Sequence, residues 1–245
     1  MLYLIGLGIW DEKDISLKGV EKCKESDLVY AELYTANWGG SLENLDKIIG
    51  KKIKEIPRSG MEENIEKIIS EAKKMIVSIL VPGDPLVATT HTHVITEARN
   101  SGVETKIIHS SSIYSVIAKT GLHIYKFGRT ATVVAPTKDY APDSFYDVAV
   151  ENKKMGLHTL VLLDIEMNVK RAVEILLEIE ERKKKDVMKR DTKILACSRL
   201  GSDEEKIVYG KAGELLNENL SSPAVIIIPG KMHFSEEEFI EKWNK

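Results

Sequence analysis

Short apolar runs alternate with helix-length amphipathic segments along the whole chain, and this pattern constrains the fold more than any other feature. The helix-length segments span residues 16–24, 61–74, 86–101 and 169–185. The apolar runs are typical of strands and span residues 2–7, 28–33, 75–81, 103–109, 130–135, 159–163, 193–198 and 224–228. A further strand is expected at 204–210, after the turn Gly201-Ser202. This alternation predicts α/β domains whose strands are parallel and joined by right-handed crossovers.

One segment, from Thr120 to Arg129, breaks the alternation. It contains Gly121-Leu122-His123-Ile124-Tyr125-Lys126-Phe127-Gly128, which is aromatic, bounded by glycines and without clear periodicity. We interpret it as a connection between two α/β domains, residues 1–119 and 120–245, and a chain of 245 residues is long enough for both. Several strand-end loops that contain glycine or proline would then converge on a cleft.

Composition excludes several classes of protein. The formal net charge is −3, from 35 basic and 38 acidic side chains, which argues against a dedicated nucleic-acid partner. Cys23 and Cys197 lie far apart, so a disulfide framework or cysteine metal site is not expected, and a reducing cytoplasm fits. The start Met1–Gly6 has no basic region before its apolar run, and no run approaches the ~18 residues that span a bilayer, so neither a signal peptide nor a membrane anchor is predicted.

The loop Pro82-Gly83-Asp84-Pro85-Leu86-Val87-Ala88-Thr89-Thr90-His91 follows one of the predicted strands. Its prolines fix φ and lack an amide donor, while Gly83 can adopt angles closed to other residues, so the turn should be sharp and rigid. Ligands of open α/β sheets bind beyond the carboxyl ends of strands. Asp84 could contact such a ligand, or it could cap a helix that begins at Pro85. The residues alone leave both roles open.

The first strand ends in Gly6-Leu7-Gly8-Ile9-Trp10-Asp11. This stretch suggests the dinucleotide fingerprint G-x-G-x-x-G, but Asp11 occupies the third glycine position, and the acidic residues that follow delay the helix. A negative loop is also a poor neighbour for a pyrophosphate. The pattern therefore disfavours nicotinamide dinucleotide binding. Two interpretations of this segment remain: a simple turn that ends the strand, or a turn whose glycines let a ligand approach the backbone.

Histidines and serines follow other strand ends without forming a recognisable catalytic or metal site. His91 and His93 would point to different faces of a helix, so a metal site is not expected, and local hydrogen bonds or the border of a cleft suit them better. His109-Ser110-Ser111-Ser112 offers hydroxyls and backbone donors, yet no acid or base is spaced to activate a serine. Pro229-Gly230-Lys231-Met232-His233-Phe234 reads as another strand-end loop or as a turn before a final helix, 236–243.

Taken together, these motifs resemble one superfamily. The opening Tyr3–Gly8 and the loop Pro82–Pro85 look like the tetrapyrrole methylases, which use S-adenosylmethionine. Within that superfamily, further segments are similar to the archaeal diphthine synthases: Gly83–His91, Ser112-Ile113-Tyr114-Ser115, Thr120–Gly128, Gly156-Leu157-His158-Thr159-Leu160 and Pro229–His233. The match runs from Met1 to about the final helix.

The resemblance implies two α/β domains with a cofactor cleft between them, a homodimer, and S-adenosylmethionine as cofactor. It implies transfer of three methyl groups to the amine of the amino-carboxypropyl histidine of translation elongation factor 2, which gives diphthine in diphthamide biosynthesis. It also implies cofactor contacts, many through the backbone, at Ile9, Asp84, Val87, Ser112, Ile113, Leu163, Tyr209 and His233. Around Tyr209 the sequence departs most from the family's pattern.

The catalytic base is not assigned by the sequence, and three other functions remain as alternatives. One is another methyltransferase of the superfamily that acts on a tetrapyrrole precursor. The second is a module that binds the cofactor without catalysis, and the third is a nicotinamide enzyme.

Overall fold

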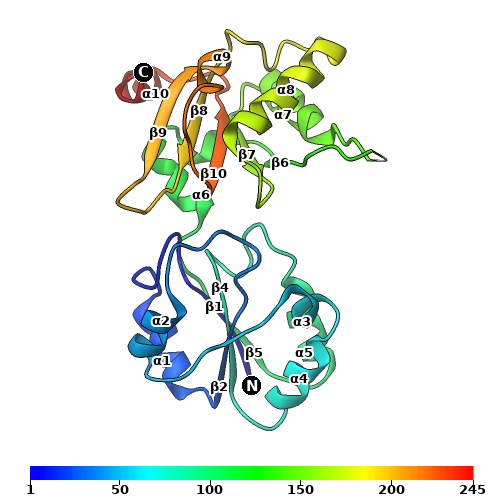
Figure 1. Cartoon of the computed structure of the whole chain (residues 1–245), viewed down its shortest axis with the longest axis vertical. Coiled ribbons are helices and arrows are strands. Elements are labelled where there is room, and N and C mark those ends of the chain that lie inside the picture. The colour runs from blue at the N-terminus through cyan, green and yellow to red at the C-terminus, as the bar shows by residue number, and fades with distance from the viewer. Residues whose placement is uncertain (139, 245) are drawn as a thin grey trace. The chain divides into compact units, whose positions relative to one another are not determined.

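The computed structural model describes residues 1–138 and 140–244, which divide into two compact units, Met1–Val116 and Ile117–Lys245. We call them unit 1 and unit 2. The α/β fold predicted from the alternation is confirmed, since each unit is a five-stranded sheet with helices (Figure 1). The predicted boundary between residues 119 and 120 falls inside a short 3₁₀ turn, η1 (Ile117–Thr120), and remains a prediction.

Unit 1 is a parallel sheet with the strand order β3-β2-β4-β1-β5. Its strands are β1 (Leu2–Gly6), β2 (Leu28–Ala31), β3 (Lys54–Glu55), β4 (Val77–Val81) and β5 (Thr105–Ile108). Its helices are α1 (Leu17–Glu25), α2 (Leu42–Ile49), α3 (Arg58–Glu62), α4 (Ile65–Ala72), α5 (Thr92–Asn100) and α6 (Ile113–Val116). Parallel order places the carboxyl ends of all these strands along one edge of the sheet.

The strands of unit 1 are covered on both faces. Leu2 and Leu4 pack with the residues of α3, α4 and α5, whereas Tyr3 and Ile5 pack on the opposite face with Cys23 of α1 and residues of α2. This split follows the two-residue period of a strand, which sends successive side chains to opposite faces. Figure 1 shows α1 and α2 on one side of the sheet and α3, α4 and α5 on the other.

Unit 2 has the strand order β6-β7-β10-β8-β9. Its strands are β6 (Ala131–Val133), β7 (Thr159–Leu163), β8 (Lys193–Ser198), β9 (Lys206–Lys211) and β10 (Ala224–Ile228). Its helices are α7 (Ser144–Lys154), α8 (Val169–Lys183), α9 (Ala212–Leu215) and α10 (Phe234–Ile240), with 3₁₀ turns η2 (Ile124–Lys126) and η3 (Glu241–Trp243). One face of the sheet packs on α7, α8 and α9 in a single apolar core.

The prediction of parallel strands is wrong for unit 2. Only β6 and β7 are parallel, while β10 runs antiparallel to both β7 and β8, and β8 and β9 form an antiparallel pair. The connection between β8 and β9 is too short for a crossover, because a parallel connection needs about a dozen residues or more. The apolar pattern located these strands, including the one expected after Gly201-Ser202, but it did not set their direction.

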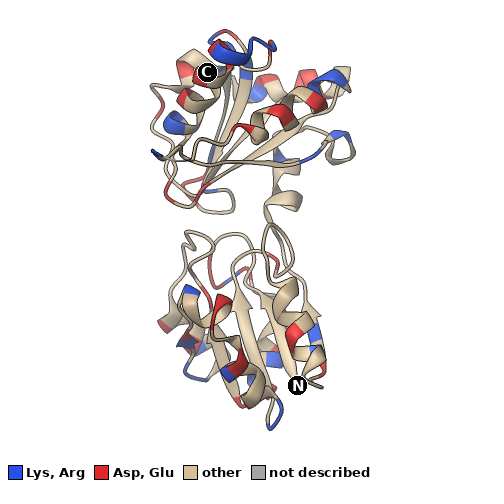
Figure 2. Ribbon diagram, turned by 90° about the vertical axis from the view of Figure 1, so that its right-hand side faces the viewer, with Lys and Arg blue, Asp and Glu red and all other residues tan. Residues whose placement is uncertain are grey.

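Two of the expected helices have other boundaries. The segment 61–74 contains two helices, because α3 ends at Glu62 and α4 begins at Ile65. The segment 86–101 is helical only from Thr92, since the preceding residues form turns in which Ala88 has a φ of 56°. In Figure 2 most of the Lys, Arg, Asp and Glu positions, coloured blue and red on the ribbon, fall on helices and loops, and the central strands are almost entirely tan.

Candidate functional site

The loops after β1 and β4 are joined directly to each other at the carboxyl edge of unit 1. The Leu7 amide donates to the Val81 carbonyl at 2.8 Å, and Gly8 and Gly83 exchange two backbone hydrogen bonds of 3.1 and 2.8 Å. A Cβ on Gly6 would lie 2.5 Å from the Gly83 carbonyl oxygen, so only glycine allows this approach. The glycines of the partial G-x-G motif therefore serve the contact between two loops.

Asp84 connects the β4 loop to the loop after β5. Its Oδ1 accepts from the Leu86 amide at 3.0 Å, and its Oδ2 accepts from the Ser110 amide at 3.2 Å and lies 2.8 Å from the Nδ1 of His109. The residue is 5% exposed. The capping alternative is excluded, because α5 begins at Thr92 rather than at Pro85. The carboxylate instead fixes the shape of the loop edge.

The other site residues predicted in unit 1 lie along the same edge. Ile9 follows the Gly8 contact, Val87 donates its amide to the Asp84 carbonyl at 3.1 Å, and Ser112 and Ile113 form the start of α6 after β5. Gly83 has a φ of 69°, and no heavy atom lies within 4 Å of where its Cβ would be. This open backbone, beside half-buried apolar side chains of Ile9 and Val87, fits a small ligand that approaches the main chain.

The acidic residues that follow Gly8 have structural partners. The Oδ2 of Asp14 accepts from the Trp10 amide at 2.8 Å, and Glu12 accepts from the Ser41 amide and the Asn44 side chain at 3.0 and 2.9 Å. These contacts close the turn after β1 and hold it against the segment before α2. The acidic side chains of this turn therefore have structural roles.

At the end of the Pro82–His91 loop, His91 forms a buried pair with Glu32, a residue that no motif in the sequence singles out. The Nε2 of His91 is 3.6 Å from the Oε1 of Glu32, and the side chains are 1% and 0% exposed. Burial raises the pKa of Glu32 to about 8, although hydrogen bonds from Thr35 partly oppose this. Burial also lowers the pKa of His91. The imidazole of His93 lies between two backbone carbonyl oxygens, with Nδ1 2.8 Å from that of Thr90 and Nε2 3.2 Å from that of Met61.

The predicted site residues of unit 2 do not gather at one place within that unit. Leu163 ends β7, whereas Tyr209 lies in the edge strand β9, which is separated from β7 by the two strands β10 and β8. His233 follows β10, whose last residue, Ile228, pairs with the first residue of β7, Thr159. Since Leu163 and Thr159 are opposite ends of one strand, Leu163 and His233 belong to opposite ends of the sheet.

The end of the unit 2 sheet that carries Leu163 has other neighbours. Leu162 pairs with Val225, and Ala224 pairs with Ser198, so the segments Pro223–Ala224 and Ser198–Leu200 lie at that same end. These neighbouring segments are identified by the register of the strands, which a single sequence does not reveal.

His233 and Tyr209 have local roles. His233 is the N-cap of α10, where its Nδ1 lies 2.8 Å from the Ser235 hydroxyl and its ring lies 4.2 Å from that of Phe234. Tyr209 is 4% exposed, and the Lys193 ammonium lies 4.9 Å above its ring. These contacts account for both side chains without a ligand.

The segment that breaks the sequence pattern is anchored to α10 by Glu236. This carboxylate is fully buried and accepts from the His123 and His233 amides, both at 2.7 Å, from the His158 imidazole at 3.0 Å, and from the Lys126 ammonium. Burial alone would raise the pKa of Glu236, but these hydrogen bonds outweigh it and lower the pKa to about 2. The aromatic stretch 121–128 is therefore an integral part of unit 2.

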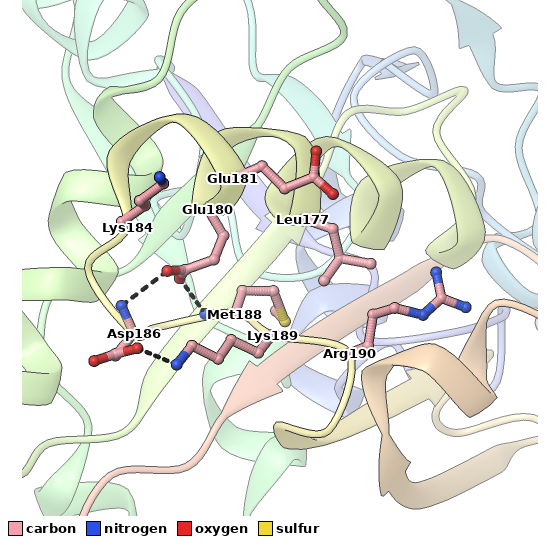
Figure 3. Close-up of a pocket in the computed structure, with 8 residues that line it drawn as sticks. All are labelled: Leu177, Glu180, Glu181, Lys184, Asp186, Met188, Lys189 and Arg190. Atoms are coloured by element: carbon pink, nitrogen blue, oxygen red, sulfur yellow. Dashed lines mark hydrogen bonds and ion pairs between the residues drawn. The ribbon is translucent and has the colours of Figure 1, made fainter.

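A second carboxylate clamp lies in a surface pocket at the end of α8. Figure 3 shows Glu180 pointing toward the backbone of the following turn, where its oxygens accept from the amides of Asp186, Val187 and Met188 at 2.9, 2.7 and 2.8 Å. The basic side chains at this pocket, Lys184, Lys189 and Arg190, are balanced by Glu180, Glu181 and Asp186. The pocket therefore has no excess charge that would attract an acidic ligand.

Within residues 1–138 and 140–244, no three His, Cys, Asp or Glu side chains are grouped so that they could hold a metal ion. No helix among these residues is both long enough and apolar enough to cross a bilayer.

Comparison with known proteins agrees with this architecture. The family model of the tetrapyrrole (corrin/porphyrin) methylases matches residues 1–216. Proteins named diphthine synthase from Methanococcus aeolicus and Methanocaldococcus jannaschii are each 43% identical to this chain, over 98% of it and over 97% and 98% of their own lengths. A crystal structure of a diphthine synthase superposes with a TM-score of 0.89 at 37% identity, covering 99% of this chain and 95% of the other. The chain belongs to the tetrapyrrole methylase family.

Proposed function

We propose that the chain is an S-adenosylmethionine-dependent methyltransferase that forms diphthine. Its substrate would be the amino-carboxypropyl histidine of translation elongation factor 2, whose amine receives three methyl groups. The observation that carries this proposal is near full-length similarity, at 43% identity, to relatives named diphthine synthase. The joined strand-end loops of unit 1 support it, because they present an open backbone at the edge where α/β sheets bind ligands.

For unit 1 we propose cofactor contacts at Ile9, Asp84, Val87, Ser112 and Ile113. The carboxylate of Asp84 already accepts from Leu86 and Ser110, so its main contribution is to hold the loop in shape. Contact with the ligand would then come from backbone groups near Gly83 and from apolar side chains of Ile9 and Val87.

For unit 2 we propose that the end of the sheet at Leu163 contacts the cofactor. Tyr209 and His233 remain predictions from the resemblance. Three strand spacings separate β7 from β9 within the unit, which amounts to about 14 Å, so a ligand that contacts both Leu163 and Tyr209 must be bound in an extended form.

The chemistry asks little of the protein beyond orientation. The bound sulfonium cofactor supplies a methyl group on an activated leaving group. The chain must hold the acceptor amine in line with that methyl group, keep water away and allow the amine to lose a proton. Alignment of this kind lowers reaction barriers by several kcal/mol, up to roughly 7–11. Rigid loops such as Gly6–Gly8 and Pro82–Pro85 suit that task.

Cytoplasmic location and homodimer formation belong to the same proposal. The compact α/β units and the free, buried Cys23 and Cys197 are compatible with a reducing compartment.

The decisive experiment incubates the protein with labelled S-adenosylmethionine and elongation factor 2 that carries the precursor side chain. We expect label on the factor. Label on uroporphyrinogen or a precorrin instead would show another methyltransferase of the family. Binding of S-adenosylhomocysteine with no transfer to either class of acceptor would indicate a regulatory module, and binding of NAD in its place would indicate a nicotinamide enzyme.

A further inference from the structure

Glu32 and His91 form a buried pair directly under the loop proposed to bind the cofactor. Glu32 is the first residue after β2, and His91 immediately precedes α5. Because β2 and β4 are neighbours in the sheet, the loops after them run side by side, and the Glu32 amide donates to the Leu80 carbonyl at 3.0 Å. The proposed methyl transfer assigns no role to either side chain.

A chain of contacts leads from Glu32 to the loop backbone. The Thr35 hydroxyl lies 2.8 and 3.0 Å from the two oxygens of Glu32. The imidazole of His91 lies between the carboxyl group and the loop, with Nε2 3.6 Å from Glu32 and Nδ1 3.3 Å from the Pro85 carbonyl oxygen. Pro85 lies between Asp84 and Val87, two residues of the proposed cofactor site.

This geometry fixes the tautomer of His91. A carbonyl oxygen can only accept, so the proton of a neutral imidazole must be on Nδ1. Its Nε2 then turns a lone pair toward the Glu32 carboxyl group. A carboxylate there would be a buried charge that faces a lone pair, whereas a protonated carboxyl group faces it favourably.

The surroundings favour the neutral pair. Burial raises the pKa of Glu32 to about 8 and lowers the pKa of His91. The charged and titratable groups around the pair are Tyr34 on the β2 loop, Arg58 and Glu62 on α3, and His93 on α5. Arg58 and Glu62 pair with each other at 3.0 Å, so neither supplies a free counter-charge.

We propose that Glu32 and His91 are positioning residues for the cofactor loop: the protonated carboxyl group of Glu32 orients the His91 imidazole, which holds the Pro85 carbonyl and thereby fixes the turn from Asp84 to Val87. The consequence for the cofactor rests on the function proposed above. The hold on the loop itself does not depend on that function.

The test compares Glu32→Ala, Glu32→Gln and His91→Ala with the control Glu97→Ala, which removes an exposed carboxyl group on α5. Two quantities are measured for each protein: hydrogen exchange of the amides of Leu86 and Val87, and the Kd for S-adenosylhomocysteine. We expect Glu32→Ala and His91→Ala to lose amide protection and to raise Kd at least about fivefold, the effect of leaving a buried polar group unpaired. Glu32→Gln should stay near wild type at pH 7, because its amide can donate to Nε2 and carries no charge.

A pH series separates positioning from general stability. The affinity of the wild type for S-adenosylhomocysteine should fall as the pH rises through about 8, because the carboxyl group of Glu32 ionises there. The affinity of Glu32→Gln should not fall in this range, because the amide has no group to ionise. This comparison of wild type with Glu32→Gln tests the proposal even if Glu32→Ala fails to fold. Equal pH profiles for wild type and Glu32→Gln would overturn the proposal. So would a folded Glu32→Ala with the same amide protection and Kd as Glu97→Ala. A wild-type protein that binds no S-adenosylhomocysteine would contradict the proposed function, while amide protection would still decide the role of the pair.

Discussion

His158 and Glu236, far apart in sequence, form a fully buried hydrogen bond in which Nε2 of the imidazole lies 3.0 Å from the Oε1 of the carboxylate. The Gly230 amide donates to Nδ1 of the same ring at 2.9 Å, so the proton of a neutral His158 must be on Nε2. Burial lowers the pKa of His158 and favours this neutral form, despite the carboxylate beside it. Helix α10, the segment before β7 and the loop after β10 thus meet at one ring.

Replacement of Glu236 should therefore destabilise the protein in a pH-dependent way. The folded pKa of Glu236 is about 2, below its ordinary value of 4.5, so its stabilising effect is complete above 4.5 and is lost as the pH falls toward 2. At pH 7 we expect Glu236→Gln to lower the free energy of unfolding by about 3 kcal/mol, since it leaves Lys126 without its partner. Urea denaturation at pH 7 and pH 3 measures this. The exposed Glu237→Gln is the control, and an equal loss at both pH values would contradict the prediction.

Asp84→Asn should weaken cofactor binding by more than the accompanying loss in the free energy of unfolding can account for. The amide keeps one oxygen for the Leu86 amide but cannot accept from both Ser110 and His109, so the loops after β4 and β5 separate. We expect the Kd for S-adenosylhomocysteine, measured by calorimetry, to rise at least about tenfold. Asp27→Asn is the matched control, because Asp27 makes a similar bond to the Ile76 amide at the opposite, amino-terminal edge of the sheet. A comparable rise in Kd for that variant would argue against a local effect.

Gly83→Ala and Gly50→Ala make a matched pair for the backbone of the loop. Both glycines have positive φ, 69° and 74°, and a Cβ at either position meets no atom within 4 Å. Each substitution should cost about 1 kcal/mol of stability, because an L-residue is strained in this region. Only Gly83→Ala should also impair cofactor binding, since its Cβ would occupy the open space beside the loop. Thermal denaturation and calorimetry of both variants provide the comparison, and equal affinities would remove Gly83 from the site.

Two substitutions, one at each end of the unit 2 sheet, distinguish which end contacts the cofactor. If the cofactor lies at the Leu163 end, Ala224→Leu should raise the Kd for S-adenosylhomocysteine at least about fivefold through steric obstruction, while His233→Ala should leave it unchanged. Ala224 is half-buried, so the melting temperature of each variant must be recorded with its affinity. The reverse result, a loss of affinity in His233→Ala alone, would place the contact at the β10 loop, as the resemblance implies.

The strand-end loops show how far the sequence could predict the site. The apolar run before Pro82 and the glycines at 6 and 8 correctly placed two turns at the carboxyl ends of strands, because parallel strands of one sheet share that edge. The sequence did not show that these turns bond to each other through Gly8 and Gly83, or that Asp84 joins them to Ser110. These contacts connect residues that are distant in the chain and leave no local pattern.

Glu32 was missed for the same reason. The predicted strand at 28–33 included Glu32, but nothing in the apolar pattern singled this residue out. Only the tertiary structure reveals that its side chain is fully buried against His91. Leu163, Tyr209 and His233 illustrate the converse case. Each was assigned by resemblance, yet strand order and direction put them at separate places within unit 2.

The sequence by itself determined where the strands other than β3 lie, that the fold is α/β, and which turns are rigid, because hydrophobic period, proline and glycine act over a few neighbouring residues. Only the tertiary structure decided that β10 runs antiparallel between β7 and β8, that the helix after the proline loop begins at Thr92, and that buried carboxyl groups hold the loops. These features depend on pairing and desolvation between distant segments. The free energy of such contacts belongs to the folded arrangement and is not encoded in any local stretch.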